Sequence, residues 1–181
     1  MKDPMRWETR KLQRGITVDT TSYIYDLPYP KGQSYPMVQG YFTQLTHKRR
    51  AALDFKLPVG STITAARGGV VVRVKKDGHQ GGIKKKNRQH ANFVIIQHTD
   101  SSRAGYWHLQ HEGTFVEIGD TVVTGQKIAL SGNTGYTYFP HLHFIVWGFD
   151  GNRRFKQIPT RFRTEDGPQF LRAIRNYRNP K

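Results

Sequence analysis

The sequence predicts an all-β fold. Its 18 glycines and 9 prolines lie between many short β-branched runs, a pattern typical of short strands joined by turns. A chain of 181 residues is long enough for one well-buried domain with additional segments at its ends. We therefore expect a basic N-terminal arm over residues 1–22, one domain over 23–150, and a basic C-terminal extension over 151–181.

Charge and cysteine content limit the function classes. Lys and Arg number 29 against 13 Asp and Glu, a formal net charge of +16, which favours an anionic partner such as nucleic acid, a membrane surface or an acidic cell-wall polymer. The chain has no cysteine, so disulfides, thiolate metal sites and a cysteine nucleophile are excluded. Any metal must be held by His, Asp or Glu.

Membrane and export signals are missing from the printed sequence. No apolar stretch approaches the roughly 20 residues that span a bilayer, so we expect no transmembrane segment. The first 30 residues lack the basic-then-apolar pattern of a secretory signal. Either the protein stays inside the cell, or the sequence is a mature form whose signal has been removed.

The first half of the domain reads as short strands, all short enough for an antiparallel sheet. Within 51–55, Leu53 and Phe55 face one way and Asp54 the other. An acidic residue inside such a strand is unusual and indicates a specific role for Asp54. The strands expected here cover residues 23–25, 37–41, 51–55, 62–66 and 69–74.

The middle of the chain changes character. Residues 75–90 hold three glycines and six lysines or arginines, which predicts a long, mobile, cationic loop. A strand pair follows over 93–98 and 105–109, joined by a polar turn at 100–102. Residues 116–130 alternate turns and strands in the manner of biotinyl and lipoyl carrier barrels, which bears on fold and not on catalysis.

The C-terminal segment predicts one short helix. Phe170, Leu171, Ile174 and Tyr177 stand at helical spacing after Pro168. We expect this apolar stripe to pack against the domain.

The motif with the clearest chemistry is His141-Leu142-His143, just before an apolar run. Successive side chains of a strand point to opposite faces, so the two imidazoles project side by side. Neutral imidazole is a common zinc ligand and a common general base. A pocket that holds two can supply one of each.

Three further residues join this pair. His47, Asp54 and His108 lie beside apolar strand positions or turns. Two imidazoles and one carboxylate make a catalytic zinc site, because three protein ligands leave a position for water. Taken singly, the same residues could be a surface histidine, a hydrogen-bonded acid and a strand-edge imidazole.

The remaining four histidines have no motif around them, and His98 among them is expected to be structural. They are His79, His90, His98 and His111.

Taken in order, the motifs resemble those of lysostaphin-type, LytM-like zinc metalloendopeptidases. The resemblance covers roughly residues 27–146. It rests on the residues His47 to Gly60, Ala65 to Val71, Tyr106-Trp107-His108-Leu109, Ser131 to Gly135 and Pro140 to Phe144.

The resemblance implies an open antiparallel β-sheet with a groove. It implies that His47, Asp54 and His143 hold Zn²⁺, while His108 and His141 transfer protons and stabilise the transition state. The implied substrate is the peptide part of bacterial peptidoglycan, either a stem-peptide cross-link or a glycine bridge. That substrate implies a periplasmic or extracellular location and a signal segment encoded upstream.

Two positions depart from the family pattern. Lys48 to Leu53 separate His47 from Asp54, whereas many members place these two residues closer together. Trp107 replaces the alanine often found before the catalytic histidine, which should narrow the groove. In relatives a tyrosine near the site stabilises the oxyanion, and Tyr41 is the candidate here.

Other readings of the sequence remain open. The first is a catalytically inactive or inhibited LytM-like module that binds peptidoglycan or regulates another hydrolase. The second is a nucleic-acid-binding protein, favoured by charge and by 12% aromatic residues, but no nucleic-acid motif is present and we expect no specific nucleic acid partner. A carrier-type barrel is disfavoured, because the sequence has no lysine between two flanking methionines. The basic segments would suit anionic wall polymers.

Overall fold

A computed structural model describes residues 23–43, 46–149 and 155–181. The predicted arm at 1–22 lies outside these residues. Strands dominate the described chain, and its one helix is the short 3-10 helix η1 (Lys85–His90). The all-β prediction is therefore confirmed.

The main sheet has nine strands, and every pairing within it is antiparallel. Strands β7 (Phe93–Gln97) and β8 (Arg103–Trp107) are joined by the turn that the sequence predicts at 100–102. In spatial order the sheet contains β10 (Thr121–Val122), β5 (Gly69–Lys75), β7 (Phe93–Gln97), β8 (Arg103–Trp107), β13 (Leu142–Phe149), β3 (Ala52–Phe55), β2 (Ser34–Gln39) and β16 (Arg175–Arg178), with β14 (Phe155–Gln157) also paired to β13.

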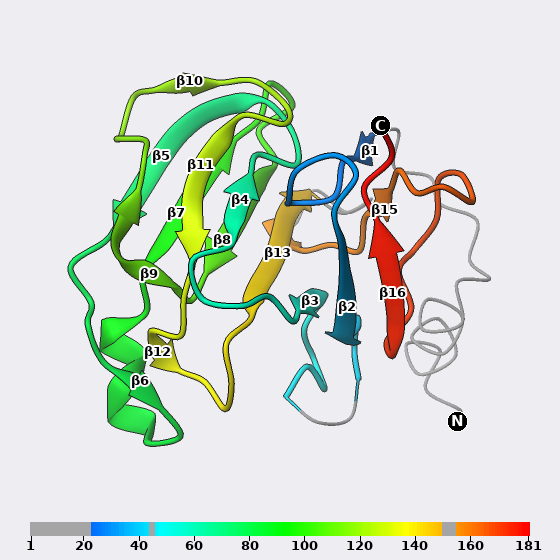
Figure 1. Cartoon of the computed structure of the whole chain (residues 1–181). Coiled ribbons are helices and arrows are strands. Elements are labelled where there is room, and N and C mark those ends of the chain that lie inside the picture. The colour runs from blue at the N-terminus through cyan, green and yellow to red at the C-terminus, as the bar shows by residue number, and fades with distance from the viewer. Residues whose placement is uncertain (1–22, 44–45, 150–154) are drawn as a thin grey trace, which may run out of the picture.

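A second, three-stranded sheet packs over one face of the main sheet (Figure 1). It consists of β4 (Thr62–Thr64), β11 (Lys127–Ser131) and β9 (Leu109–Thr114) in the order β4-β11-β9. The alternate side chains of both sheets fill the space between them, which removes apolar surface from water. This core includes Ile63, Leu109, Ile128, Ile96, Tyr106 and Phe144, all of them buried.

Two small parallel pairs complete the fold: β1 (Ile24–Tyr25) with β15 (Arg161–Phe162), and β6 (Gly81–Gly82) with β12 (Gly135–Tyr136). Strand β6 and η1 both lie within residues 75–90, where the sequence predicts a long, mobile, cationic loop. That prediction is wrong in part. A Cβ on Gly81 would come within 1.7 Å of the Asn133 carbonyl oxygen, so the absence of a side chain permits the pairing that sequence periodicity cannot reveal.

The predicted C-terminal helix is wrong. Residues 175–178 form β16, which pairs with β2 so that Arg175 lies opposite Met37. Leu171 and Tyr177 are buried as expected, but Ile174 is 90% exposed and has a φ of 63°. Its backbone N–H donates to the Met37 carbonyl at 2.8 Å. The open edge of β2 offers hydrogen bonds that outweigh the helical spacing.

Candidate active site

The site begins with two paired strands. On β3 and β13, Asp54 lies directly opposite His143. The Nδ1 atom of His143 is 2.6 Å from Oδ1 of Asp54. Asp54 itself is buried, so its charge requires partners.

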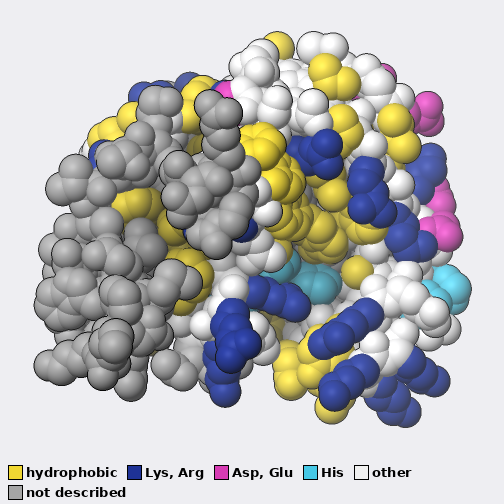
Figure 2. All heavy atoms as spheres, turned by 180° about the vertical axis from the view of Figure 1, so that it is seen from behind, with side chains coloured by type: hydrophobic (Ala, Val, Ile, Leu, Met, Phe, Trp, Pro, Cys, Tyr) yellow, Lys and Arg dark blue, Asp and Glu magenta, His cyan; other side chains and the backbone are white. Residues whose placement is uncertain are grey.

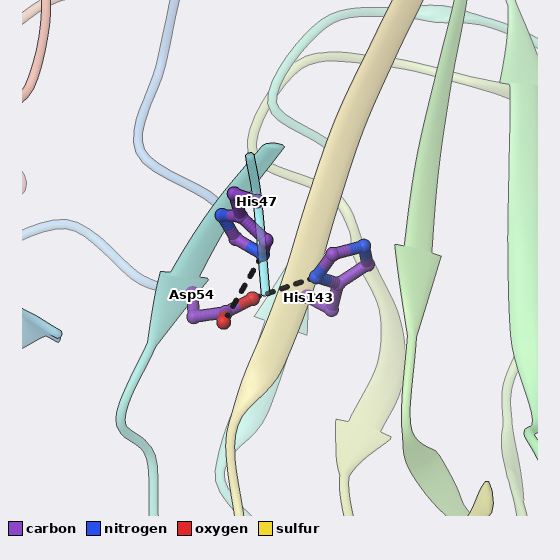
Figure 3. A group of neighbouring side chains, drawn as sticks. All are labelled: His47, Asp54 and His143. Carbon is purple, nitrogen blue, oxygen red and sulfur yellow. Dashed lines mark hydrogen bonds and ion pairs between the residues drawn. The ribbon is translucent and has the colours of Figure 1, made fainter. Parts of the chain in front are cut away.

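His47 approaches the same carboxylate from the segment between β2 and β3. Its Nε2 is 3.3 Å from Oδ2 of Asp54. Its Nδ1 is 3.1 Å from the Gly40 carbonyl oxygen, which can only accept a hydrogen bond, so in the neutral ring the proton is on Nδ1 and Nε2 carries a lone pair. Figure 3 shows His47, Asp54 and His143 converging on one point.

These three residues fit a zinc ion. One ligand atom from each lies within 4.8 Å of the others, and two imidazole nitrogens with one carboxylate are ligands that zinc prefers. Nε2 of His47 is buried and has no hydrogen-bond partner among the described residues. A buried lone pair without a donor is costly, and a cation at this point would satisfy it.

His108 and His141 complete the cluster. Their ring centroids are 4.6 Å apart, and the His108 ring is 5.8 Å from that of His143. Nε2 of His141 lies 3.7 Å from Oδ1 of Asp54. His108 stands between β8 and β9 with a φ of 64°, an uncommon conformation for a residue with a side chain and one that recurs at functional sites.

Backbone carbonyls fix the tautomers of both rings. Nδ1 of His108 donates to the Thr134 carbonyl at 2.7 Å, and Nδ1 of His141 donates to the Phe139 carbonyl at 2.7 Å. In the neutral rings, each Nε2 is therefore left as an acceptor. The chain thus presents two oriented proton acceptors beside the candidate metal ligands.

The environment also sets the charges. Burial alone would raise the pKa of Asp54, but the neighbouring His143, His47 and His141 outweigh it and hold that pKa well below its ordinary value. Burial, together with the positive charges that His141 and His143 would carry, lowers the pKa of His108 to about 3. Burial likewise lowers the pKa of His141. At neutral pH the site therefore holds an ionised carboxylate beside two neutral imidazoles.

Sequence reasoning missed Gln39. This buried residue pairs with Asp54 across β2 and β3, and its Nε2 donates to Oδ2 of Asp54 at 2.6 Å. Thr46 holds the amide in place, because its backbone N–H donates to Oε1 of Gln39 at 3.0 Å. The only signal in the sequence is a glutamine inside a predicted strand, which does not identify its partner.

Tyr41 is hydrogen-bonded to Thr160. Its hydroxyl is 3.0 Å from the Thr160 carbonyl oxygen and accepts from the Thr160 backbone N–H, also at 3.0 Å. This arrangement argues against the prediction that Tyr41 stabilises an oxyanion.

The remaining histidines lie outside the cluster. His98 is buried, and its Nδ1 is 2.8 Å from the Gly68 carbonyl oxygen, which gives it the structural place that the sequence predicts. His79 lies with its ring 5.5 Å from that of His90 and 6.0 Å from that of His111.

The five predicted site residues thus form one cluster. Figure 2, the view from behind Figure 1, shows histidine side chains in a hollow, with hydrophobic side chains beside them and Lys and Arg around it. A buried His-Asp-His group next to two neutral histidines is the arrangement of a metal-dependent hydrolase.

The family comparison agrees with this class of protein. A family model described as Peptidase family M23 matches residues 48–155. The chain belongs to this family. His47 lies immediately before the matched segment, and the other four clustered residues lie within it.

Curated relatives include peptidoglycan peptidases. The chain is 36% identical over 108 residues to peptidoglycan DD-endopeptidase ShyA of Vibrio cholerae. The aligned residues make up 59% of this chain and 22% of ShyA. It is 31% identical over 117 residues to lysostaphin of Staphylococcus simulans. These residues make up 65% of this chain and 19% of lysostaphin. The chain therefore spans about a fifth of the length of these relatives.

A solved structure supports the same fold. The crystal structure of a zinc-containing peptidase from Vibrio cholerae matches with a TM-score of 0.53 and 28% identity, over 75% of this chain and 39% of that chain. The lysostaphin-type, LytM-like fold that the sequence resembles is thus confirmed.

Proposed function

We propose that this chain is a zinc metalloendopeptidase that hydrolyses peptide bonds in the stem or cross-link peptides of bacterial peptidoglycan. The observation that carries the proposal is the buried group of His47, Asp54 and His143 beside the neutral pair of His108 and His141. The similarity to ShyA, a peptidoglycan DD-endopeptidase, supports the choice of substrate.

Each residue has a role in this proposal. His47 through Nε2, Asp54 through a carboxylate oxygen and His143 through Nδ1 would hold Zn²⁺. When bound, the ion would polarise a substrate carbonyl and acidify a water molecule. Gln39 would orient the Asp54 carboxylate.

The proton transfers belong to the other two histidines. His141 presents Nε2 as a base because Phe139 holds the proton on Nδ1. His108, held by Thr134, would donate a proton to the leaving amine or stabilise the oxyanion after it is protonated on Nε2. The two rings are 4.6 Å apart, so these roles can be shared between them.

The proposal extends to location and partners. Peptidoglycan lies outside the cytoplasmic membrane, so this activity would place the protein in the periplasm or outside the cell. The described residues include no helix that is both long and apolar enough to cross a bilayer. Lys84, Lys85 and Lys86 are exposed, and with the net charge of +16 they favour anionic wall polymers as further partners.

The experiment uses isolated sacculi. The zinc-loaded chain is incubated with sacculi that carry direct stem-peptide cross-links and with sacculi that carry glycine bridges, and the soluble fragments are analysed by mass spectrometry. New peptide termini at one defined bond are expected from one of the two. Zinc bound at one per chain without fragments would favour the alternative, an inactive or inhibited peptidoglycan-binding module.

A further inference from the structure

Two tryptophans cover the sheet next to the candidate metal ligands. Trp107 on β8 lies opposite His143 on β13. Trp147 is also on β13, four residues after His143. Side chains at these positions point away from the core, on the same face as His143. The Trp107 ring is 6.2 Å from the His143 ring and 5.2 Å from the Trp147 ring. Both tryptophans are partly exposed.

Gly105 makes room for both rings. A Cβ at this position would lie 2.1 Å from Cζ3 of Trp107 and 2.9 Å from Cζ3 of Trp147. Both indoles therefore lie directly over the bare backbone of β8. The glycine permits an aromatic surface that any other residue would displace.

The aromatic surface continues away from the metal ligands. On β7, the Phe93 ring is 5.8 Å from the Trp107 ring, and the Arg73 guanidinium lies over Phe93 at 5.2 Å. Nearby, Nε of Arg103 donates to Oε1 of Gln97 at 3.0 Å. We call Phe93, Trp107 and Trp147 the aromatic platform. It is bordered by planar side chains that can form hydrogen bonds.

The backbone beneath the platform is already satisfied. Strand β7 pairs with β5 and β8, β8 pairs with β7 and β13, and β13 pairs with β8 on one side and with β3 and then β14 on the other. These inner strands offer no free edge to an extended peptide, whose main chain binds at sheet edges. A ligand of the platform must therefore bind through ring faces and side chains.

We propose that the platform binds the glycan strand of the substrate by stacking sugar rings on the tryptophans. The C–H face of a pyranose ring is apolar and slightly positive, and it complements the negative face of an indole. Arg73, Arg103 and Gln97 are placed to bond the equatorial hydroxyl and amide groups. This inference rests on the proposed function, in which the glycan carries the peptide cleaved beside His143.

The first test needs no hydrolysis. Chitotetraose, a peptide-free saccharide, is titrated into the full chain in a calorimeter. Saturable binding is expected, and Trp147→Ala should weaken it about tenfold or more. The control Phe115→Ala removes an aromatic residue that is 51% exposed and lies outside the platform, and it should bind as the unchanged chain does.

Gly105→Ala gives a second route to the same result. Its added methyl group would displace both indoles without removing either, and weaker binding is expected. Thermal unfolding and zinc content establish that each variant is folded. No saturable binding, or equal binding by folded Trp147→Ala, would overturn the proposal. Tighter binding of oligo(dT) than of chitotetraose, lost in Trp147→Ala, would also overturn it, because stacked bases would then be the ligand.

The second test separates the platform from the chemistry. Cross-linked fragments that keep their sugars are compared with the same cross-linked peptides after amidase has removed the sugars. The sugar-bearing substrate should have the lower KM, and Trp147→Ala should raise that KM to the value for bare peptide while kcat stays the same. Equal KM values in the unchanged chain would contradict the platform. Loss of all hydrolysis with retained chitotetraose binding would contradict the proposed function alone.

Discussion

Asp54 connects the residues of the site. Its two carboxylate oxygens lie 2.6 Å from Nδ1 of His143, 3.3 Å from Nε2 of His47 and 2.6 Å from Nε2 of Gln39. A buried carboxylate with several partners is held in one orientation. Nε2 of His141 lies farther from this carboxylate, 3.7 Å from Oδ1, and this difference separates the proposed proton acceptor from the proposed metal ligands.

Replacement of His141 tests that distinction. His141→Ala should keep one zinc per chain, because its Nδ1 is committed to Phe139 and its Nε2 is assigned as a base. Hydrolysis should fall by about 10²- to 10⁴-fold, the usual loss for a general base. Zinc content by atomic absorption and turnover on sacculi measure the two effects. A folded variant without metal would show that His141 is a ligand.

Gln39 offers a test of the residue that the sequence did not reveal. Gln39→Leu removes the donor to Asp54 while keeping a buried side chain of similar size. Zinc affinity should fall about 10- to 100-fold, as for other residues that orient a ligand. Competition with a chelator measures the affinity, and Asp54→Ala serves as the metal-free reference. Unchanged affinity would mean that Gln39 only fills space.

The sequence alone predicts the histidines and the aspartate of the site, but it does not predict Gln39. His141-Leu142-His143 is predictable because strand alternation places both rings on one face. Asp54 is found because an acid inside an apolar strand is unusual, and His47 because it precedes Asp54 in the family pattern that the sequence resembles. Gln39 is missed because its role depends on the register of β2 against β3, which includes an irregularity that no local pattern encodes.

Among the elements, β16 shows how tertiary pairing overrides a local pattern. The apolar spacing around Ile174 fits a helix, yet the segment pairs with β2. Ile174 adopts a φ of 63° at the start of this strand while remaining 90% exposed. A left-handed conformation costs an L-residue about 1–2 kcal/mol.

The strained backbone at Ile174 predicts which of two substitutions gives the more stable protein. Ile174→Gly should be more stable than Ile174→Ala by about 1 kcal/mol, because only glycine relieves the strained φ. Urea unfolding of the two variants measures the difference. A helix over residues 168–177 would reverse the order, since glycine in a helix interior is less stable than alanine by about 1 kcal/mol.

For the whole molecule, the buried His98 predicts a pH dependence of stability. Burial lowers the pKa of His98 from 6.5 to about 4, and its Nε2 has no hydrogen-bond partner among the described residues. Between pH 6.5 and about 4 the unfolded chain binds the extra proton. The free energy of unfolding should therefore fall as pH falls through this window, by about 3 kcal/mol from this group.

The control isolates His98 from the other histidines. His98→Asn keeps a donor that can reach the Gly68 carbonyl but does not titrate. Its free energy of unfolding should change less between pH 6.5 and 4 than that of the unchanged chain, as measured by urea unfolding at several pH values. An equal change would show that His98 protonates without cost in the folded state.

At this scale the fold class was predictable because the glycine turns and β-branched runs extend along the whole chain. The two-sheet arrangement and the aromatic platform were not. Trp107, Trp147 and Gly105 are adjacent only because β8 and β13 pair in one register. That register is fixed by the packing of both sheets, which lies beyond any local window.

The measurement that tests the central claim most directly is the mass spectrum of soluble fragments released from isolated sacculi by the zinc-loaded chain. We expect new peptide termini at one defined bond, absent when His141→Ala replaces the unchanged chain. Intact sacculi after incubation with a chain that carries one zinc would contradict the claim that this site hydrolyses peptidoglycan peptides.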